Sequence, residues 1–288
     1  TPDQRQPHTP NPSHTPNPSH TPNPSHTPNP SHTPNPPEPP TRRACTTVRV
    51  MAATVAEGVC WVLREDPDLA DAIDPADRGL ATEALVAREV KLAPGTWPAR
   101  PIAVDGGIGL LVLEGVILHR VGIDDRCGAE LVGEGDVVRP LQGEIEPAGL
   151  RPTIECQILE RARLAVLDER FARQLAGFPA VAGRLFARAA VRARRLAVNL
   201  AIVHQARVDI RLQLLLWHLA GRWGRVRPDG VLVPLRLTHA VLADLVAARR
   251  PTVTSALARL SREDVVWAVD EGWLLRGPPP QGPSTSSR

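Results

Sequence analysis

The spacing of apolar positions along the chain changes several times, and each spacing predicts a different kind of element. From residue 51 to about 88 the pattern is helical. From residue 90 to 167, short apolar runs alternate with glycines, which is typical of antiparallel strands joined by tight turns. We therefore expect helices followed by a small antiparallel barrel or roll.

The expected strands of this roll are short. They cover residues 108–113, 115–121, 129–132 and 137–138, with a further strand pair at 153–159 and 162–167. A turn that reads Gly-Glu-Gly-Asp joins the third strand to the fourth, from Gly133 to Asp136.

Helical spacing returns at Pro179, which can occupy the first turn of a helix that we expect to run to about residue 207. Its apolar positions cover more than one stripe, which is more than packing against one neighbour requires. They include Val181, Leu185, Phe186, Leu196, Leu200 and Val203. This helix either packs on both the roll and a second copy of the chain, or is buried within its own domain. Val208 and Asp209 resemble a hinge, with Asp209 as the N-cap of an apolar helix over residues 210–220.

The segment from residue 226 to 275 has the element order of a winged helix-turn-helix. Two short strands flank a Pro-Asp-Gly turn, and Thr238 then caps a helix over residues 240–246. Ala247 is small where the chain must turn, and Pro251 suits the first turn of a second helix. The alternation over residues 265–275, around Glu271 and Gly272, predicts a hairpin.

The second helix of this segment has side chains suited to DNA. Arginine reads guanine bidentately, while a helix N-terminus and a hydroxyl can hold a phosphate. The whole chain has a net charge of only +3, but arginines outnumber acidic residues two to one over residues 190–276. The predicted DNA-binding residues are Thr238, His239, Arg249, Arg250, Thr252, Ser255 and Arg259. The alternative is a winged helix that binds only proteins.

The sequence LTHAVLADLVAARRPTVTSALARL, at residues 237–260, resembles the helix-turn-helix of the Crp/Fnr transcription regulators, which are named after the cyclic-AMP receptor protein and the fumarate–nitrate regulator. The resemblance extends over about residues 51–275. It implies a cyclic-nucleotide-binding-like sensor, a dimerisation helix and a homodimer on pseudo-palindromic DNA. The base-reading positions of the family fall on Arg250, Pro251 and Ser255. The implied partners are double-stranded DNA, a second copy of the chain and RNA polymerase.

The resemblance also implies where an effector would bind. The family follows its Gly-x-Gly-Asp turn with Gly-Glu and a later arginine, whereas this chain continues with Arg139 and Pro140. The candidate effector residues are Gly133, Glu134, Arg139, Glu144 and Arg151. The departures disfavour cyclic AMP, so the expected cofactor is another small-molecule or nucleotide effector of unknown identity, or none.

The two ends of the chain differ from the rest. The repeated hexapeptide HTPNPS within residues 1–50 has no core-forming residue, and we expect a disordered arm with polyproline II character. The tail after Arg276, rich in Pro, Gly and Ser, is also expected to be disordered. The only methionine is Met51, and we take it as a candidate for the natural start of the polypeptide.

No sequence motif indicates catalysis or a metal centre. The four cysteines, Cys45, Cys60, Cys127 and Cys156, lack the spacing of an iron–sulfur or zinc cluster, and no phosphate loop or catalytic triad motif is present. No apolar run has the roughly 20 residues of a membrane helix, and no signal-peptide pattern is found. We therefore expect a cytoplasmic protein that is not an enzyme.

Together these patterns predict an α+β fold in which an N-terminal antiparallel β-roll with flanking helices is followed by a long dimerisation helix and a winged helix-turn-helix. The expected domains are an arm (1–50), a sensor roll (51–178), the dimerisation helix (179–207), the DNA-binding domain (208–276) and a tail (277–288).

Overall fold

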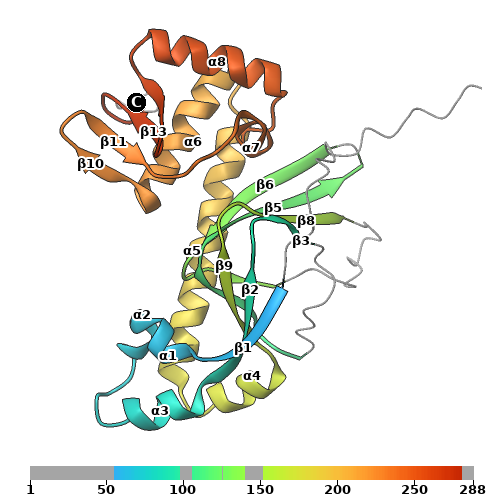
Figure 1. The fold of residues 1–288 in the computed structure, drawn as a ribbon, viewed down its shortest axis with the longest axis vertical. Coiled ribbons are helices and arrows are strands. Elements are labelled where there is room, and N and C mark those ends of the chain that lie inside the picture. The colour runs from blue at the N-terminus through green and yellow to red at the C-terminus, as the bar shows by residue number, and fades with distance from the viewer. Residues whose placement is uncertain (1–54, 98–105, 125, 140–151, 281–288) are drawn as a thin grey trace, which may run out of the picture. The chain divides into compact units, whose positions relative to one another are not determined.

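The computed structural model describes residues 55–97, 106–124, 126–139 and 152–280 (Figure 1). All of its strand pairs are antiparallel, and they alternate with helices along the chain. The predicted α+β class is therefore confirmed, with an antiparallel roll before a long helix and a helix-turn-helix after it.

The first element, β1 (Val55–Trp61), corrects the helical pattern expected from residue 51 onward. It is an edge strand that pairs with β2 (Val86–Leu92), and three short helices lie between the two: α1 (Val62–Glu65), α2 (Pro67–Ala70) and α3 (Arg78–Ala84). Val59 and Trp61 are exposed while Cys60 is buried, so only one face of the strand is covered. A seven-residue strand of this kind is too short to be separated from a helix by spacing alone.

The roll consists of two sheets. The five-stranded sheet has the order β1-β2-β9-β4-β7 and the four-stranded sheet the order β3-β8-β5-β6. Their remaining strands are β3 (Gly95–Trp97), β4 (Gly109–Glu114), β5 (Val116–Ile123), β6 (Arg126–Gly133), β7 (Val137–Val138), β8 (Thr153–Ile158) and β9 (Ala162–Leu167). All six strands expected after residue 107 are present. However, β8 and β9 belong to different sheets and do not pair with each other.

Two helices follow the roll: α4 (Glu169–Leu175) and the long α5 (Pro179–Val203). One face of the first two turns of α5 is buried in a cluster that includes Phe171 of α4 and Leu69 of α2. Val181 and Leu185 belong to this cluster, with 0% and 4% of their surface exposed. Their prediction as dimer contacts is therefore wrong, because the chain's own core covers them.

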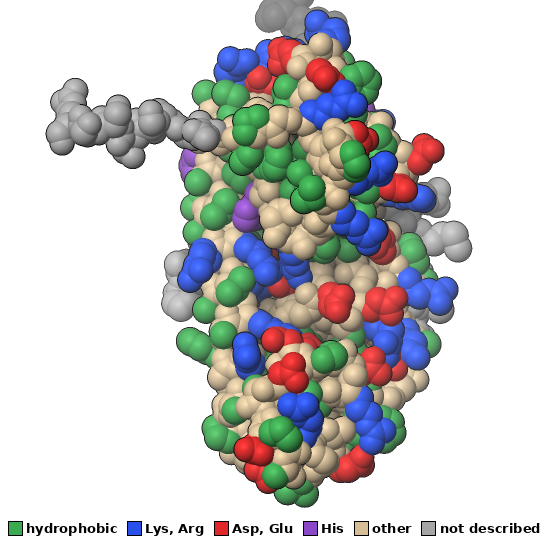
Figure 2. Space-filling model, turned by 90° about the vertical axis from the view of Figure 1, so that its left-hand side faces the viewer, with side chains coloured by type: hydrophobic (Ala, Val, Ile, Leu, Met, Phe, Trp, Pro, Cys, Tyr) green, Lys and Arg blue, Asp and Glu red, His purple; other side chains and the backbone are tan. Residues whose placement is uncertain are grey.

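Farther along, α5 is held to the roll by arginines. Arg188 pairs with Asp66 and Asp68, Arg192 pairs with Glu130, and Arg195 pairs with Asp136. These arginines follow one another at the helical spacing of three or four residues. On the face shown in Figure 2, basic and acidic side chains lie next to one another over the middle and lower parts.

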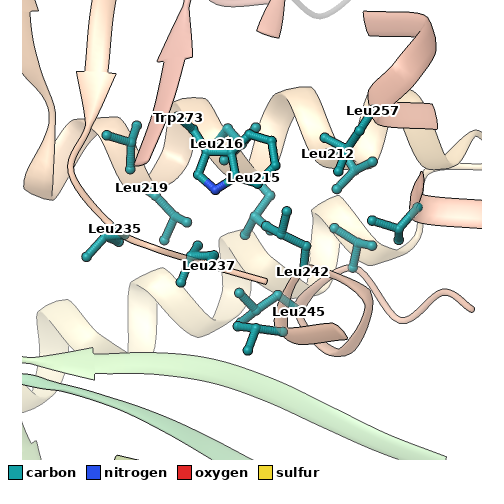
Figure 3. Packing of buried hydrophobic residues seen from close by; sticks show 14 of the residues in the cluster. Leu212, Leu215, Leu216, Leu219, Leu235, Leu237, Leu242, Leu245, Leu257 and Trp273 are labelled. Carbon is teal, nitrogen blue, oxygen red and sulfur yellow. The ribbon is translucent and has the colours of Figure 1, made fainter. Parts of the chain in front are cut away.

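The C-terminal part contains α6 (Val208–Trp223), β10 (Arg225–Arg227), β11 (Gly230–Val233), α7 (His239–Leu245), α8 (Arg250–Arg262), β12 (Val266–Val269) and β13 (Gly272–Leu275). The strands form one sheet of order β10-β11-β13-β12. Leucines of α6, α7 and α8 share its core with Trp273 of β13, and Figure 3 shows Leu212, Leu242 and Leu257 among them. This is the element order predicted for a winged helix-turn-helix.

One detail of α6 differs from the expectation. The N-cap of the helix is Arg207, and Asp209 lies inside the first turn rather than capping it. The Asp209 side chain is turned toward two arginines, Arg207 and Arg259, instead of toward the backbone of its own helix.

Candidate nucleic-acid interface

The turn between α7 and α8 is built by local sequence features. The Thr238 hydroxyl accepts a hydrogen bond from the Val241 backbone N–H at 3.3 Å, which caps α7. Ala247 has a φ of 50°, a left-handed conformation that ends the first helix sharply. Arg211 of α6 donates to the carbonyl oxygens of Val246 and Ala247 and so fixes this turn to the domain core.

The helix α8 has one buried face and one exposed face. Val253, Leu257 and Leu260 are buried in the domain core. The opposite face, in its N-terminal half, exposes Arg250, Pro251, Thr252, Thr254 and Ser255. Pro251 occupies the first turn and Arg249 is the N-cap, which gives the helix no side-chain cap. An exposed basic helix N-terminus of this kind suits a phosphate or a base edge.

Two predicted residues lie beside this surface. His239 lies in the first turn of α7, with its Nδ1 atom 2.9 Å from the Thr254 hydroxyl. Its ring is tilted relative to the Trp273 ring, and the two ring centroids are 6.2 Å apart. Thr238 is exposed, but its hydroxyl is already used as the cap. Sequence reasoning missed Thr254, although its place one helical turn after Arg250 on the exposed face could have indicated it.

Arg259 has different surroundings from the other predicted residues. Its guanidinium is bound to the Asp209 carboxylate, and its Nε lies 3.9 Å from Glu263. Burial alone would raise the pKa of Asp209, but hydrogen bonds from Arg207 and Arg259 outweigh it and the pKa is lowered. The charge of Arg259 therefore ties α8 to α6, and with 37% of its side chain exposed its role as a DNA contact stays a prediction.

The wing contributes a small cluster that the sequence did not indicate. The exposed Trp267 donates from its indole N–H to Asp264 at 2.7 Å, and Arg276 donates to the same carboxylate at 2.6 Å. The Arg276 guanidinium lies over the Trp267 ring, 5.7 Å from its centroid. No local spacing reveals this cluster, since it joins residues from both sides of a hairpin.

The predicted effector residues are not brought together among the described parts of the chain. Glu134 contributes its backbone carbonyl, which accepts from Arg222 of α6 at 2.6 Å. Arg139 donates to the carbonyl of Gly107 at 3.1 Å. A Cβ at Gly133 would lie 3.0 Å from the Trp223 ring, so α6 packs closely against this glycine. Glu144 and Arg151 lie outside the described residues.

In the turn between β6 and β7, Asp136 is the residue whose side chain makes several hydrogen bonds. Its carboxylate accepts from the Gly133 backbone N–H at 3.0 Å, from Arg195 at 2.8 Å and from Arg222 at 2.6 Å. The aspartate thus connects three elements, namely the β6–β7 turn, α5 and α6.

The interior of the roll is almost filled by apolar side chains. The described residues leave a cavity of about 20 Å³ there, enough for about one water. His119 and Cys156 border it, and burial raises the pKa of the Cys156 thiol to about 12. His119 Nδ1 lies 3.1 Å from Glu130, while its Nε2 is buried without a partner among the described residues.

Two absences hold for the part of the chain that the structure describes. No three or more His, Cys, Asp or Glu side chains gather in a way that could hold a metal ion. No helix there combines the length and apolar character needed to cross a membrane.

Comparison with known proteins identifies the C-terminal domain. Residues 210–274 match the family model of the Crp-like helix-turn-helix domain. A mutant of CooA from Carboxydothermus hydrogenoformans has a similar fold, with 17% identity, coverage of 66% of this chain and 83% of that chain, and a TM-score of 0.52.

Two further structures have lower TM-scores. A transcriptional regulator of the CRP family from Thermus thermophilus has 22% identity over 58% of this chain and 81% of that chain, with a TM-score of 0.44. The c-di-GMP responsive regulator CLP from Xanthomonas campestris has 19% identity over 60% and 86%, with a TM-score of 0.46. Comparison with curated proteins finds no match. The chain therefore carries a Crp-like helix-turn-helix domain on a fold like that of CooA, and its resemblance to the Crp/Fnr transcription regulators is confirmed.

Proposed function

We propose that this protein is a transcription regulator that binds a specific, pseudo-palindromic DNA site as a homodimer. The observation that carries the proposal is the exposed N-terminal half of α8, which presents Arg250, Thr252 and Ser255 beside the N-cap Arg249. A helix held in this way by a preceding helix and a wing can place its first turns in a major groove.

The homodimer is supported by an uncharged stripe on α5. Phe186 and Leu200 are 77% and 58% exposed, although both are large and apolar. Three exposed alanines lie between them at the spacing of a coiled-coil seam: Ala190, Ala193 and Ala197. Small side chains let two helices approach closely, so the stripe suits a second copy of α5.

Three of the residues predicted for the dimer contact remain in this proposal. Leu200 lies on the stripe, Leu196 flanks it with 39% of its surface exposed, and Val203 is half-buried at the end of α5. In a dimer joined along α5, the two α8 helices would enter successive major grooves about 34 Å apart.

We further propose that residues 51–178 form the sensor, 179–207 the dimerisation helix and 208–276 the DNA-binding domain. Among the described residues, the small cavity inside the roll is lined by apolar side chains apart from His119 and Cys156. Together with Arg139 and Pro140 in place of the family's Gly-Glu, this supports an effector that is a small molecule or a nucleotide other than cyclic AMP. RNA polymerase is the further partner that such a regulator would contact.

The test is selection of DNA from a random duplex library by the full chain, compared with its Arg250→Ala variant at fixed salt. We expect a two-fold symmetric motif that the variant loses or relaxes. Arg262→Ala is the matched control, because it removes an arginine from the other end of the same helix.

Absence of an enriched motif, both alone and with added cell-extract metabolites, would overturn the proposal. The domain would then be a winged helix that binds proteins rather than DNA. A motif without two-fold symmetry would contradict the homodimer and leave sequence-specific binding in place.

A further inference from the structure

A crevice of about 460 Å³ lies where α5, α6 and the end of β6 meet. One wall consists of three arginines: Arg192 and Arg195 of α5, and Arg222 of α6. Another wall is apolar and contains Leu215, Leu219 and Trp223. The crevice is separate from the small cavity inside the roll, with which it shares no lining residue.

The arginine wall has more positive than negative charge. Two carboxylates, Glu130 and Asp136, face the three guanidinium groups, and their side chains are only 10% and 5% exposed. Arg195 is the most accessible of the three arginines, with 35% of its side chain exposed, and it donates a single hydrogen bond to Asp136. Most of its five N–H donors therefore remain for a ligand.

Two further side chains indicate a polar ligand. The Asn199 Oδ1 atom is buried and has no hydrogen-bond partner among the described residues. His218 also lines the crevice, and burial lowers its pKa, with the nearby Arg195 lowering it further. The arginines of the crevice can donate hydrogen bonds to an oxyanion of a ligand, and the Asn199 Oδ1 atom can accept one from a neighbouring donor group of the same ligand.

We propose that this crevice binds a small organic anion, with its oxyanion on Arg195 and Arg222 and its apolar part against Leu215, Leu219 and Trp223. A guanidinium binds carboxylate and phosphate oxygens with the same fork geometry, so the oxyanion is the shared chemistry. The position of the bound oxyanion also predicts an effect on α6. A bound anion competes with Asp136 for Arg195 and Arg222, and so loosens the attachment of α6 to the β6–β7 turn.

The experiment uses three probes on the full chain: hexanoate, hexanamide and inorganic phosphate. The readout is the ring resonance of His218 in proton NMR at constant pH and ionic strength, assigned with a His218→Gln variant. We expect saturable shifts with hexanoate and smaller or weaker ones with phosphate, which lacks the apolar part. Hexanamide, which has the same shape without the charge, is expected to leave the resonance unchanged.

Three variants test whether binding depends on Arg195. Arg195→Gln is expected to weaken hexanoate binding about tenfold or more, since it removes a charge-assisted contact. Arg194→Gln, which changes an exposed arginine next to it on α5, is the matched control and is expected to bind normally. Arg195→Lys keeps the positive charge, and its affinity for hexanoate is expected to lie between those of Arg195→Gln and Arg194→Gln.

Equal shifts with hexanamide, an unchanged affinity in Arg195→Gln, or no shift with any probe would each overturn the proposal. Folding of each variant is checked by its NMR spectrum without ligand. Binding of DNA is measured separately, so a failure of the anion site is distinguishable from a failure of the proposed function.

Discussion

Arg250 and Arg259 lie on the same helix, and the structure gives them different surroundings. Arg250 is exposed at the first turn, whereas Arg259 is bound to Asp209, a carboxylate with only 10% of its side chain exposed. Both are arginines on the outward side of a basic helix, so their sequence context is nearly the same. What separates them is a partner from another helix, far away in the chain.

Substitutions at these two arginines should therefore affect different properties: DNA binding for Arg250 and folding stability for Arg259. Arg250→Ala is expected to weaken specific DNA binding by roughly 10- to 100-fold, about 1–3 kcal/mol, with an unchanged free energy of unfolding. Arg259→Gln is expected to lower the free energy of unfolding by about 1–2 kcal/mol, because Asp209 stays buried with one partner fewer. Urea denaturation and DNA titration at one salt concentration measure both. An unfolding midpoint unaffected by Arg259→Gln would contradict the structural role.

His218 should make the folded state sensitive to mild acid. Burial, together with Arg195, lowers its pKa below the ordinary value of 6.5, so the unfolded chain binds the proton more tightly. The stability is fully present above about pH 6.5 and is lost as the pH falls from there toward the lowered folded-state pKa. Between about pH 7 and 5, the wild type is expected to lose more stability than His218→Gln in urea denaturation. Equal losses in both proteins would rule out this role.

The residues that sequence analysis placed correctly are those whose role is local. Thr238 as a cap, Ala247 at the turn and Pro251 in a first turn depend only on near neighbours. Asp209 and Gly133 were given other roles, because Arg259 and Trp223, which explain them, are far away in the sequence.

At the scale of elements, α5 has two faces with different chemistry. One face carries the arginines that pair with acids of the roll and of α2, and another carries the stripe from Phe186 to Leu200. The sequence showed that α5 has more apolar surface than one neighbour requires. It could not show which residues the chain itself covers, and Val181 and Leu185 were misplaced for that reason.

A charge on the stripe should separate the protomers. Leu200→Glu is expected to convert the dimer to a monomer, because symmetry brings two like charges to one uncharged seam. Val198→Glu is the matched control, since Val198 is 40% exposed on the same helix but points away from the stripe. Analytical ultracentrifugation at micromolar concentration gives the mass. A Leu200→Glu variant that is still dimeric would show that the contact lies elsewhere.

For the strands too, features set by near neighbours were predicted, and features that depend on distant parts of the chain were not. Glycine-bounded apolar runs predicted the six strands from β4 to β9, because turns and alternation are local signals. The pairing of β8 with β5 and of β9 with β2 and β4 was not predicted, since pairing joins segments that are distant in sequence. The strands β1, β2 and β3, which precede these six, were not predicted.

At the scale of the whole molecule, two charged contacts connect the roll to the helix-turn-helix. Arg120 of β5 donates to Asp244 of α7 at 2.8 Å and to Gln157 of β8 at 3.0 Å. Arg222 of α6 donates to Asp136 beside the β6 strand. Neither interdomain pair could be predicted from spacing, because more than eighty residues separate the two members of each.

Removal of Arg120 should loosen α7 specifically. In Arg120→Ala, Asp244 loses its partner, and faster backbone hydrogen exchange is expected in α7 than in the wild type. Arg88→Ala is the control, because Arg88 pairs with Glu57 on the surface of the roll. Hydrogen exchange followed by mass spectrometry checks both variants. Equal exchange of α7 in wild type and Arg120→Ala would show that this contact does not hold the helix.

The uncharged stripe of α5 determines how assembly should respond to cold and to salt. Association through apolar surface weakens on cooling, and salt screens it little. Binding of an arginine-rich helix to DNA, in contrast, falls steeply as salt rises. A dimer joined along this stripe would therefore persist in concentrated salt that releases DNA, and would dissociate more readily near freezing. Pairing and DNA binding could then be separated in the unmodified protein by the choice of temperature and salt alone.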